Sequence, residues 1–370
     1  MRLGLEPQVT AIDPVPVVDR PPAAGSWGHR HLLDVDVLSW ADTELVLRTT
    51  DAMREVLARP IAKVPALRGT NVTILFYEAS TRTRVSFEVA AKNLSADVVN
   101  IAAASSSVSK GESLIDTVKT VEALGARMLV MRHATSGAPY LAARHFGGHV
   151  LNGGDGWHAH PTQALLDLYT IREALARRPG DGGTGSTAVR ADPASLDGRF
   201  LHGRKVVILG DILHSRVARS NIWTLTAAGA DLWLCGPATL LRGFEAWARH
   251  GVRGSTSGAG SLTVTSDASA ALRDADVIMT LRIQRERMEG GLLPSLREYG
   301  ARFGLTTARL ADARPDVVVM HPGPMNEGVE IAADVAAGPH SVITDQVTNG
   351  VAVRMAILYL LAGAGESASG

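Results

Sequence analysis

The amino-acid sequence predicts an α/β protein with two doubly wound parallel-sheet domains of similar architecture. Short β-branched runs alternate with helical patterns, which is typical of parallel strands covered by helices. The chain has 370 residues, more than one hydrophobic core usually organises, and this favours two domains. The predicted strands are residues 72–76, 98–101, 128–131, 206–209, 232–234, 277–279 and 317–320.

Two segments show no such periodicity. Residues 1–28 are rich in Pro, Gly and Ala, and we expect a flexible N-terminal tail that carries no chemistry. Residues 178–196 are rich in Gly, Asp, Ser and Thr, and they predict a surface insertion close to the domain junction.

Composition excludes several classes of function. Lysine plus arginine and aspartate plus glutamate each number 37, so no global charge favours nucleic acid or an anionic membrane as partner. The longest apolar stretch, 355–363, is much shorter than the ~20 residues that cross a bilayer. The single cysteine, Cys235, permits neither a disulfide framework nor a cysteine-rich zinc site, and it suits the cytoplasm. The histidines and aspartates lack zinc-ligand spacing, and we expect no metal and no cofactor.

Polar side chains follow five of the predicted strands. Parallel sheets bind ligands at the carboxyl ends of their strands, so these residues predict the site. They offer donors rather than carboxylates, which favours anionic ligands. The segments are Ser80 to Arg84, Arg132 with His133, Asp211 to Arg216, Thr280 to Gln284, and His321 to Pro324.

The segment Ser80-Thr81-Arg82-Thr83-Arg84 lies between a strand and a predicted helix. The inner face of that helix is Phe87, Ala90, Ala91 and Leu94. Backbone N-H groups at a helix start, together with hydroxyls and a guanidinium, can bind phosphate. Ordinary helix capping beside surface arginines would give the same pattern. The pattern is not a Walker loop, and Gly210-Asp211-Ile212 does not continue into a dinucleotide fingerprint, which disfavours a nicotinamide oxidoreductase.

Three motifs carry a resemblance to a known family. Residues 76–84 resemble the carbamoyl phosphate signature of the aspartate and ornithine carbamoyltransferases. His160-Pro161-Thr162-Gln163 resembles a second family motif, with Thr where ornithine enzymes typically carry Cys. His321-Pro322-Gly323-Pro324 differs from the His-Cys-Leu-Pro of ornithine enzymes, and no Ser-Met-Gly loop is present. These departures favour aspartate, and the resemblance extends from about residue 31 to 361.

The resemblance implies transfer of the carbamoyl group from carbamoyl phosphate to L-aspartate, giving N-carbamoyl-L-aspartate and phosphate, an early step of pyrimidine biosynthesis. It implies a carbamoyl phosphate-binding domain at 29–163 plus 347–364 and an aspartate-binding domain at 164–346. The last helix, around 351–361, would pack back on the first domain. No serine or cysteine nucleophile stands beside a base, so we expect direct attack by the amine.

The resemblance also implies roles for the motif residues. The phosphate would be held by Ser80, Thr81, Arg82 and Thr83. The carbamoyl carbonyl oxygen would be faced by Thr83, Arg132 and His160. The carbamoyl NH2 group would be oriented by Gln163 and the backbone carbonyl of Pro322, beside Gly323. The aspartate would be bound by Lys110, Arg216, Arg282 and Gln284.

Ser106 and Lys110 match a family loop that reaches into the site of a neighbouring subunit. The resemblance therefore implies a homotrimer, to which regulatory chains or a dihydroorotase could be added. By composition alone, the same loop would be a Ser-rich exposed segment with one solvated lysine.

Three departures from the family pattern bear on affinity and regulation rather than on the reaction type. Glu327 stands where many bacterial relatives carry a basic residue, Ala159 replaces a common Gln, and the 178–196 insertion is longer than usual. Two alternatives stay open: a carbamoyltransferase with another amine acceptor, as in the ornithine type, and an inactive homologue that serves as a scaffold subunit.

Overall fold

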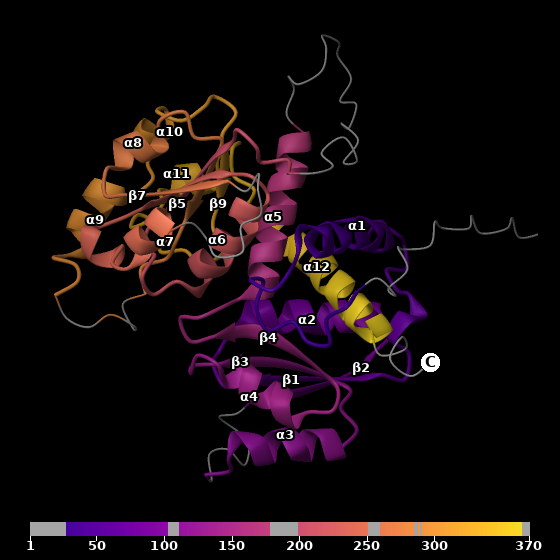
Figure 1. The fold of residues 1–370 in the computed structure, drawn as a ribbon. Helices are drawn as coiled ribbons and strands as arrows, with labels where there is room; N and C mark the ends of the chain where they lie inside the picture. Colours follow the sequence, from indigo (N-terminus) through magenta and orange to yellow (C-terminus); the bar gives the residue numbers. More distant parts are fainter. Residues whose placement is uncertain are drawn as a thin grey trace, which may run out of the picture.

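Two parallel sheets form two lobes of the molecule (Figure 1). The computed structural model describes residues 27–102, 111–177, 199–250, 260–284, 288 and 291–364. All strand pairings within these two sheets are parallel, and the predicted fold class is confirmed. The first sheet has the order β2-β1-β3-β4 and the second has the order β7-β6-β5-β8-β9. The strands are β1 (Asn71–Phe76), β2 (Asp97–Ala102), β3 (Met128–His133), β4 (His149–Asp155), β5 (Lys205–Leu209), β6 (Asp231–Cys235), β7 (Ser261–Thr265), β8 (Val277–Thr280) and β9 (Val318–Met320).

Helices cover both faces of the first sheet. Side chains alternate across a strand, so Ile74 of β1 packs in the core beneath α2 while its neighbour Leu75 packs toward α3 and α4. The helices of this lobe are α1 (Trp40–Leu57), α2 (Thr81–Asn93), α3 (Leu114–Ala123), α4 (Ala138–His145), α5 (Pro161–Ala176) and α12 (Ile343–Ala364), with a 3-10 turn at Pro65–Leu67.

The second sheet is covered in the same way. Ile208 of β5 packs with Ile222 of α6, and Val207 packs on the opposite face with Tyr299 of α9. The helices of this lobe are α6 (Arg216–Ala227), α7 (Phe244–His250), α8 (Ala268–Leu272), α9 (Leu296–Phe303), α10 (Thr307–Leu310) and α11 (Ala333–Ala336), with a 3-10 turn at Ala238–Leu240.

The predicted strands correspond to seven of these, and β4 and β7 were not predicted from the sequence. Strand β4 contains Asn152-Gly153-Gly154, residues that are depleted in strands. A Cβ atom at Gly154 would lie 3.1 Å from atoms of both Arg132 and Arg216, so the glycine lets two site arginines approach the backbone. Strand β7 is an edge strand whose five residues are all at least partly exposed, so it lacks the apolar run that marks a buried strand.

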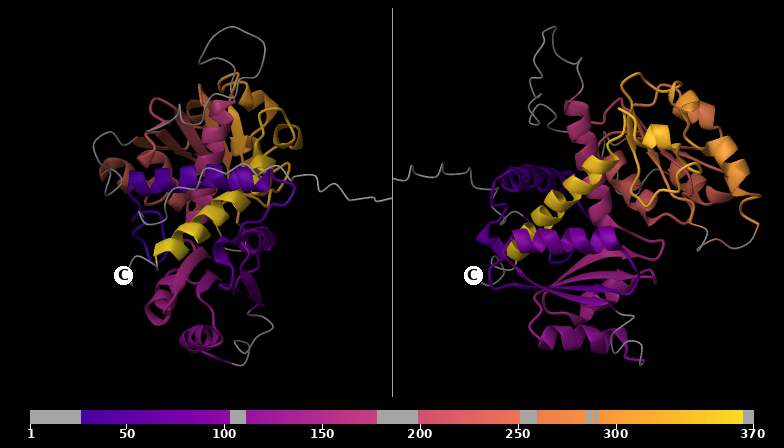
Figure 2. Two further views of the ribbon diagram at one scale, coloured as in Figure 1. Left: turned by 90° about the vertical axis from the view of Figure 1, so that its right-hand side faces the viewer. Right: turned by 180° about the vertical axis from the view of Figure 1, so that it is seen from behind.

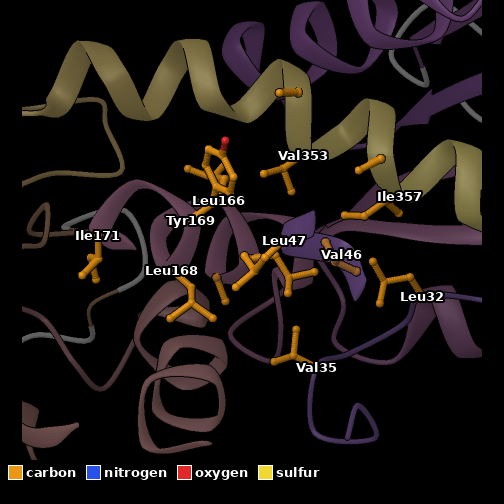
Figure 3. Close-up of a cluster of buried hydrophobic side chains, with 14 of the residues drawn as sticks. Leu32, Val35, Val46, Leu47, Leu166, Leu168, Tyr169, Ile171, Val353 and Ile357 are labelled. Atoms are coloured by element: carbon orange, nitrogen blue, oxygen red, sulfur yellow. The ribbon is translucent and has the colours of Figure 1, made fainter. Parts of the chain in front are cut away.

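Helices α1, α5 and α12 form a packed layer at the centre of the molecule. Helix α12 contacts α1, α2 and α5, and α5 also contacts α6 of the second lobe. Figure 2 shows α12 lying across the first lobe beside α1 and α2. The side chains drawn in Figure 3 show the contact, with Val46 and Leu47 of α1, Leu166 and Tyr169 of α5, and Val353 and Ile357 of α12. Helix α5 thus contacts both lobes. The domain boundaries at 163/164 and 346/347 stay a prediction.

Helix α12 is also, within the ranges given above, the helix whose length and apolar composition would suffice to cross a membrane. Most of its apolar window is buried inside the molecule, including Ala352, Val353 and the run Met355 to Leu358. A core helix of a two-lobed protein has this character, and the packing on α1, α2 and α5 accounts for it.

We predict that Leu358→Ala destabilises the protein much more than Val347→Ala. Leu358 is fully buried and Val347 is 52% exposed on the same helix. Deleting a buried leucine side chain costs about 2–5 kcal/mol, whereas a surface truncation changes the free energy of unfolding by about 0.5 kcal/mol or less. Urea unfolding of the two variants measures the difference. Equal effects would show that α12 is not part of the core.

Candidate active site

A cavity of about 920 Å³ lies where the two lobes meet. It is at both places where the strand order reverses, beside β1 and β3 in the first sheet and beside β5 and β8 in the second. All predicted site residues within the described ranges line it: Ser80, Thr81, Arg82, Thr83, Arg132, His160, Gln163, Arg216, Arg282, Gln284, Pro322 and Gly323. Ser106 and Lys110 lie outside the described residues. The roles of all these residues remain predictions.

The Ser80 segment forms the start of helix α2. Ser80 is the N-cap, and its hydroxyl accepts a hydrogen bond from the backbone N-H of Thr83 at 3.4 Å. The first turn contains no acidic residue, so its positive dipole end is not neutralised by a side chain. Capping and phosphate binding are therefore compatible, because the cap uses one of the N-H groups of this turn.

Arg82 lies against the segment that follows β9. Gly323 has φ +65° and a Cβ atom there would lie 2.9 Å from Cζ of Arg82, so glycine permits this approach. Partial burial and the positive charge of Arg282 both lower the pKa of Arg82. Arg82 of the first lobe and Arg282 of the second lobe thus face the same cavity and influence each other electrostatically.

Glu78 binds Arg132 of its own lobe and Arg216 of the second lobe. Its Oε1 accepts from Nη2 of Arg132 at 2.8 Å and from Nη2 of Arg216 at 2.6 Å, and its Oε2 accepts from Nη1 of Arg216 at 3.1 Å. The prediction that these strand ends carry donors rather than carboxylates is incomplete, because the Glu78 carboxylate lies among the arginines. A glutamate directly after a strand and next to an arginine cluster was the available signal.

His160 is the N-cap of α5, and its backbone N-H donates to the Ser220 hydroxyl of α6 at 2.9 Å. The side chain is buried, and no partner for Nδ1 occurs within the described part of the chain. Burial, followed by the charges of Arg132, Arg216 and Arg354, lowers the pKa of His160 well below its usual value. The imidazole is therefore neutral at neutral pH, and it can present a ring nitrogen to a ligand.

Arg354 also lines the cavity, and sequence reasoning overlooked it. It is buried, its Nη1 donates to the Ser86 hydroxyl at 2.8 Å, and its guanidinium lies 5.1 Å from the centre of the Phe87 ring. Burial lowers the pKa of Arg354 to about 10. An arginine inside the apolar run 351–361 was a usable signal, because a buried charge in a core helix is rare without a local reason.

Gln284 is held by the loop that follows β5. Its backbone N-H donates to Oδ2 of Asp211 at 3.3 Å, and its Nε2 donates to the carbonyl of His214 at 3.3 Å. His214 pairs with Asp211 at 2.8 Å, and the ring of Trp157 packs edge-on against His214 with centroids 4.9 Å apart. Trp157 belongs to the first lobe, so this contact also crosses between the lobes.

Within the described ranges, no cluster of three or more His, Cys, Asp or Glu could hold a metal ion.

Comparison with known protein families agrees with this geometry. The model of the aspartate/ornithine carbamoyltransferase carbamoyl-P binding domain matches residues 30–173, and that of the Asp/Orn binding domain matches residues 202–361. The chain therefore belongs to the aspartate/ornithine carbamoyltransferase family.

Similar proteins within this family carry a narrower name. The aspartate carbamoyltransferase catalytic subunit of Roseiflexus sp. (strain RS-1) is 55% identical, over 90% of this chain and 95% of its own length. That of Chloroflexus aurantiacus (strain ATCC 29366 / DSM 635 / J-10-fl) is 52% identical, over 90% of this chain and 98% of its own.

A solved structure of aspartate transcarbamoylase from Trypanosoma cruzi, in complex with carbamoyl phosphate and aspartate, has a similar fold. The TM-score is 0.74 at 27% sequence identity, and the match covers 92% of this chain and 99% of that one. The same enzyme in complex with N-(phosphonacetyl)-L-aspartic acid gives a TM-score of 0.74 at 28% identity, over 92% of this chain and 98% of that one.

We predict that His160→Asn weakens the loss of stability in mild acid. The pKa of the His160 imidazole is near 6.5 in the unfolded chain and is lowered in the folded protein. Below pH 6.5 the unfolded chain therefore binds a proton that the folded protein does not, and the free energy of unfolding decreases as the pH falls. Between pH 7.5 and 5.5 the wild type should lose about 1.4 kcal/mol more than the variant. Urea unfolding at both pH values measures this. Equal losses would mean that His160 takes up a proton in the folded protein.

Proposed function

We infer that this protein is an aspartate carbamoyltransferase, which transfers the carbamoyl group of carbamoyl phosphate to the amino group of L-aspartate. One observation carries the inference: a single cavity gathers cationic side chains from the strand ends of both lobes, as two anionic substrates require. The relatives at 52–55% identity are named aspartate carbamoyltransferases, which favours aspartate as the amine that accepts the carbamoyl group.

We assign the phosphate to the start of α2. There the N-H groups of the first turn, the hydroxyls of Ser80, Thr81 and Thr83, and the guanidinium of Arg82 would bind its oxygens. Arg132 and His160 would face the carbonyl oxygen together with Thr83. Because His160 is neutral, its ring can donate a hydrogen bond without adding a further positive charge to the cluster.

We assign the two carboxylates of aspartate to Arg216 and Arg282, with Gln284 beside them. Lys110, which lies outside the described residues, would also bind aspartate. Guanidinium groups bind carboxylates in a bidentate way, as Arg216 already does with Glu78. Glu78 would then compete with the substrate for Arg216, so aspartate binding would loosen the contact between Glu78 and Arg216.

The reaction needs no covalent intermediate with the enzyme. The amine nitrogen of aspartate forms a bond to the carbamoyl carbon, the bond from that carbon to the phosphate oxygen breaks, and the departing phosphate accepts the amine proton. Negative charge grows on the carbonyl oxygen in the transition state, where Arg132, His160 and Thr83 stabilise it. Holding the two substrates side by side supplies much of the remaining acceleration.

We propose a homotrimer in which neighbouring chains complete each site. Strand β2 is an edge of the first sheet and leads directly into residues 103–110, which contain Ser106 and Lys110. Beside it, Val99 of β2 and Val85 and Val89 of α2 are each at least 38% exposed, and they form a partly apolar surface that a second chain could cover.

We also propose a cytoplasmic location. It fits the thiol of Cys235, which is buried and whose pKa is raised by burial to about 12.

An activity assay tests the proposed function. The wild type should form carbamoyl aspartate and should show no comparable turnover with ornithine. Arg82→Ala should lower kcat/KM by about 100-fold or more, because it removes a charged phosphate contact. Arg84→Ala, an exposed arginine two positions away on the same helix, should change it by less than about twofold. Turnover with ornithine instead, or none with either amine, would contradict the function; unchanged Arg82→Ala turnover would contradict the phosphate assignment.

Mixing two inactive variants tests the shared site. Lys110→Ala chains and Arg132→Ala chains should each have low activity. Reassembled together, they should recover part of it, because some sites would combine intact residues from both chains. The control is each variant reassembled with itself. No recovery in mixed oligomers, confirmed by mass, would contradict the sharing of residues between chains.

A further inference from the structure

Asp167 is a fully buried carboxylate in the middle of α5, and its partners are three side-chain amides. Its Oδ1 accepts from Nε2 of Gln163 at 2.8 Å and from Nε2 of Gln346 at 2.8 Å. Its Oδ2 accepts from Nδ2 of Asn221 at 2.9 Å. These amides come from α5, α12 and α6, so one side chain connects both lobes and the last helix.

The charge of Asp167 determines how each amide is turned. Burial raises the pKa of Asp167 to about 6, while the three amide hydrogen bonds and Arg354 oppose this, and the group is ionised at neutral pH. An ionised carboxylate can only accept hydrogen bonds, so each amide must direct its NH2 group toward Asp167 and its oxygen elsewhere. The orientation of the amides thus follows from the chemistry of their partner.

The consequence differs for the two glutamines. Gln346 directs its oxygen to the backbone N-H of His321, which donates to it at 3.0 Å. That contact holds the residue that precedes Pro322. Gln163 lines the cavity, and with its NH2 group on Asp167, its carbonyl oxygen is the end of the amide left for a ligand.

We propose that Asp167 is a positioning residue that makes this site select a carbamoyl group by its NH2. The NH2 has two N-H bonds, and its two acceptors would be the Gln163 side-chain oxygen and the Pro322 backbone carbonyl. Asp167 positions the Gln163 oxygen directly, through its hydrogen bond with the Gln163 NH2 group. It positions the Pro322 carbonyl indirectly, because Gln346 binds both Asp167 and the His321 N-H. The inference rests on the proposed function and deepens it, because it explains how a phosphate-binding cavity distinguishes carbamoyl phosphate from acyl phosphates of the same shape and charge.

Asp167→Leu tests this with acetyl phosphate as the probe, since acetyl phosphate has CH3 where carbamoyl phosphate has NH2. Leucine has a similar shape but no oxygen, so Gln163 loses the acceptor that fixes the direction of its NH2 group. We expect KM for carbamoyl phosphate to rise by about 30-fold or more. The inhibition constant of acetyl phosphate, competing with carbamoyl phosphate, should change by less than about threefold. If both change by the same factor, Asp167 has only a structural role and the proposal is wrong.

Two further variants keep the test decisive. Gln346→Met keeps the contact between Gln163 and Asp167 but removes one donor to Asp167 and the acceptor for the His321 N-H. It should lower selectivity for carbamoyl over acetyl phosphate by about tenfold. Unchanged selectivity in this variant would overturn the proposal even if Asp167→Leu does not fold. Asp51→Leu is the matched control, because Asp51 also accepts from α5, at the Tyr169 hydroxyl and at Arg172, without contacting Gln163. It should leave selectivity unchanged.

These outcomes are separate from those that test the function itself. A wild type that forms no carbamoyl aspartate would contradict the proposed function. A wild type that forms it, with variants that keep their selectivity, would contradict only the positioning role of Asp167.

Discussion

The site depends on gathering like charges in a partly enclosed space. Arg82, Arg132, Arg216 and Arg282 line one cavity, and Arg354 lies buried at its wall. Such charges repel one another, and removing them from water adds a further cost. Glu78 offsets part of this by binding Arg132 and Arg216 together. Anionic substrates would offset the rest, so their binding is coupled to the way in which the two lobes are held together.

The topology explains why these groups meet. Each sheet reverses its strand order once, and the loops at a reversal diverge to opposite faces, which opens a crevice at the carboxyl ends of the strands. The first sheet contributes the Glu78 loop and Arg132 at its reversal, and the second contributes Arg216 and Arg282. Helix α5 begins at this crevice, so His160 and Gln163 enter it while the rest of the helix is packed against α1 and α12. The packed side chains in Figure 3 thus hold α5 in place behind the cavity.

The sequence was sufficient to predict most of this arrangement, because its signals are local. Strand ends followed by arginines, and the helix face that begins at Phe87, depend on residues close in the chain. Glu78, Arg354 and Asp167 were not assigned roles, since most of their partners lie far away in sequence. Strand β4 was overlooked for a related reason: its glycines make room for arginines of both lobes, a requirement that strand propensity does not contain.

In the proposed function, one cavity binds the phosphate and both carboxylates through cationic groups of both lobes. A crystal structure of this protein with N-(phosphonacetyl)-L-aspartic acid tests it most directly, because that molecule combines a phosphonate with the two carboxylates. We expect the phosphonate to lie at Ser80 to Thr83 and the carboxylates at Arg216 and Arg282. A ligand bound elsewhere, or guanidinium groups of these arginines turned away from it toward solvent, would mean that the cavity does not bind the two substrates in this way.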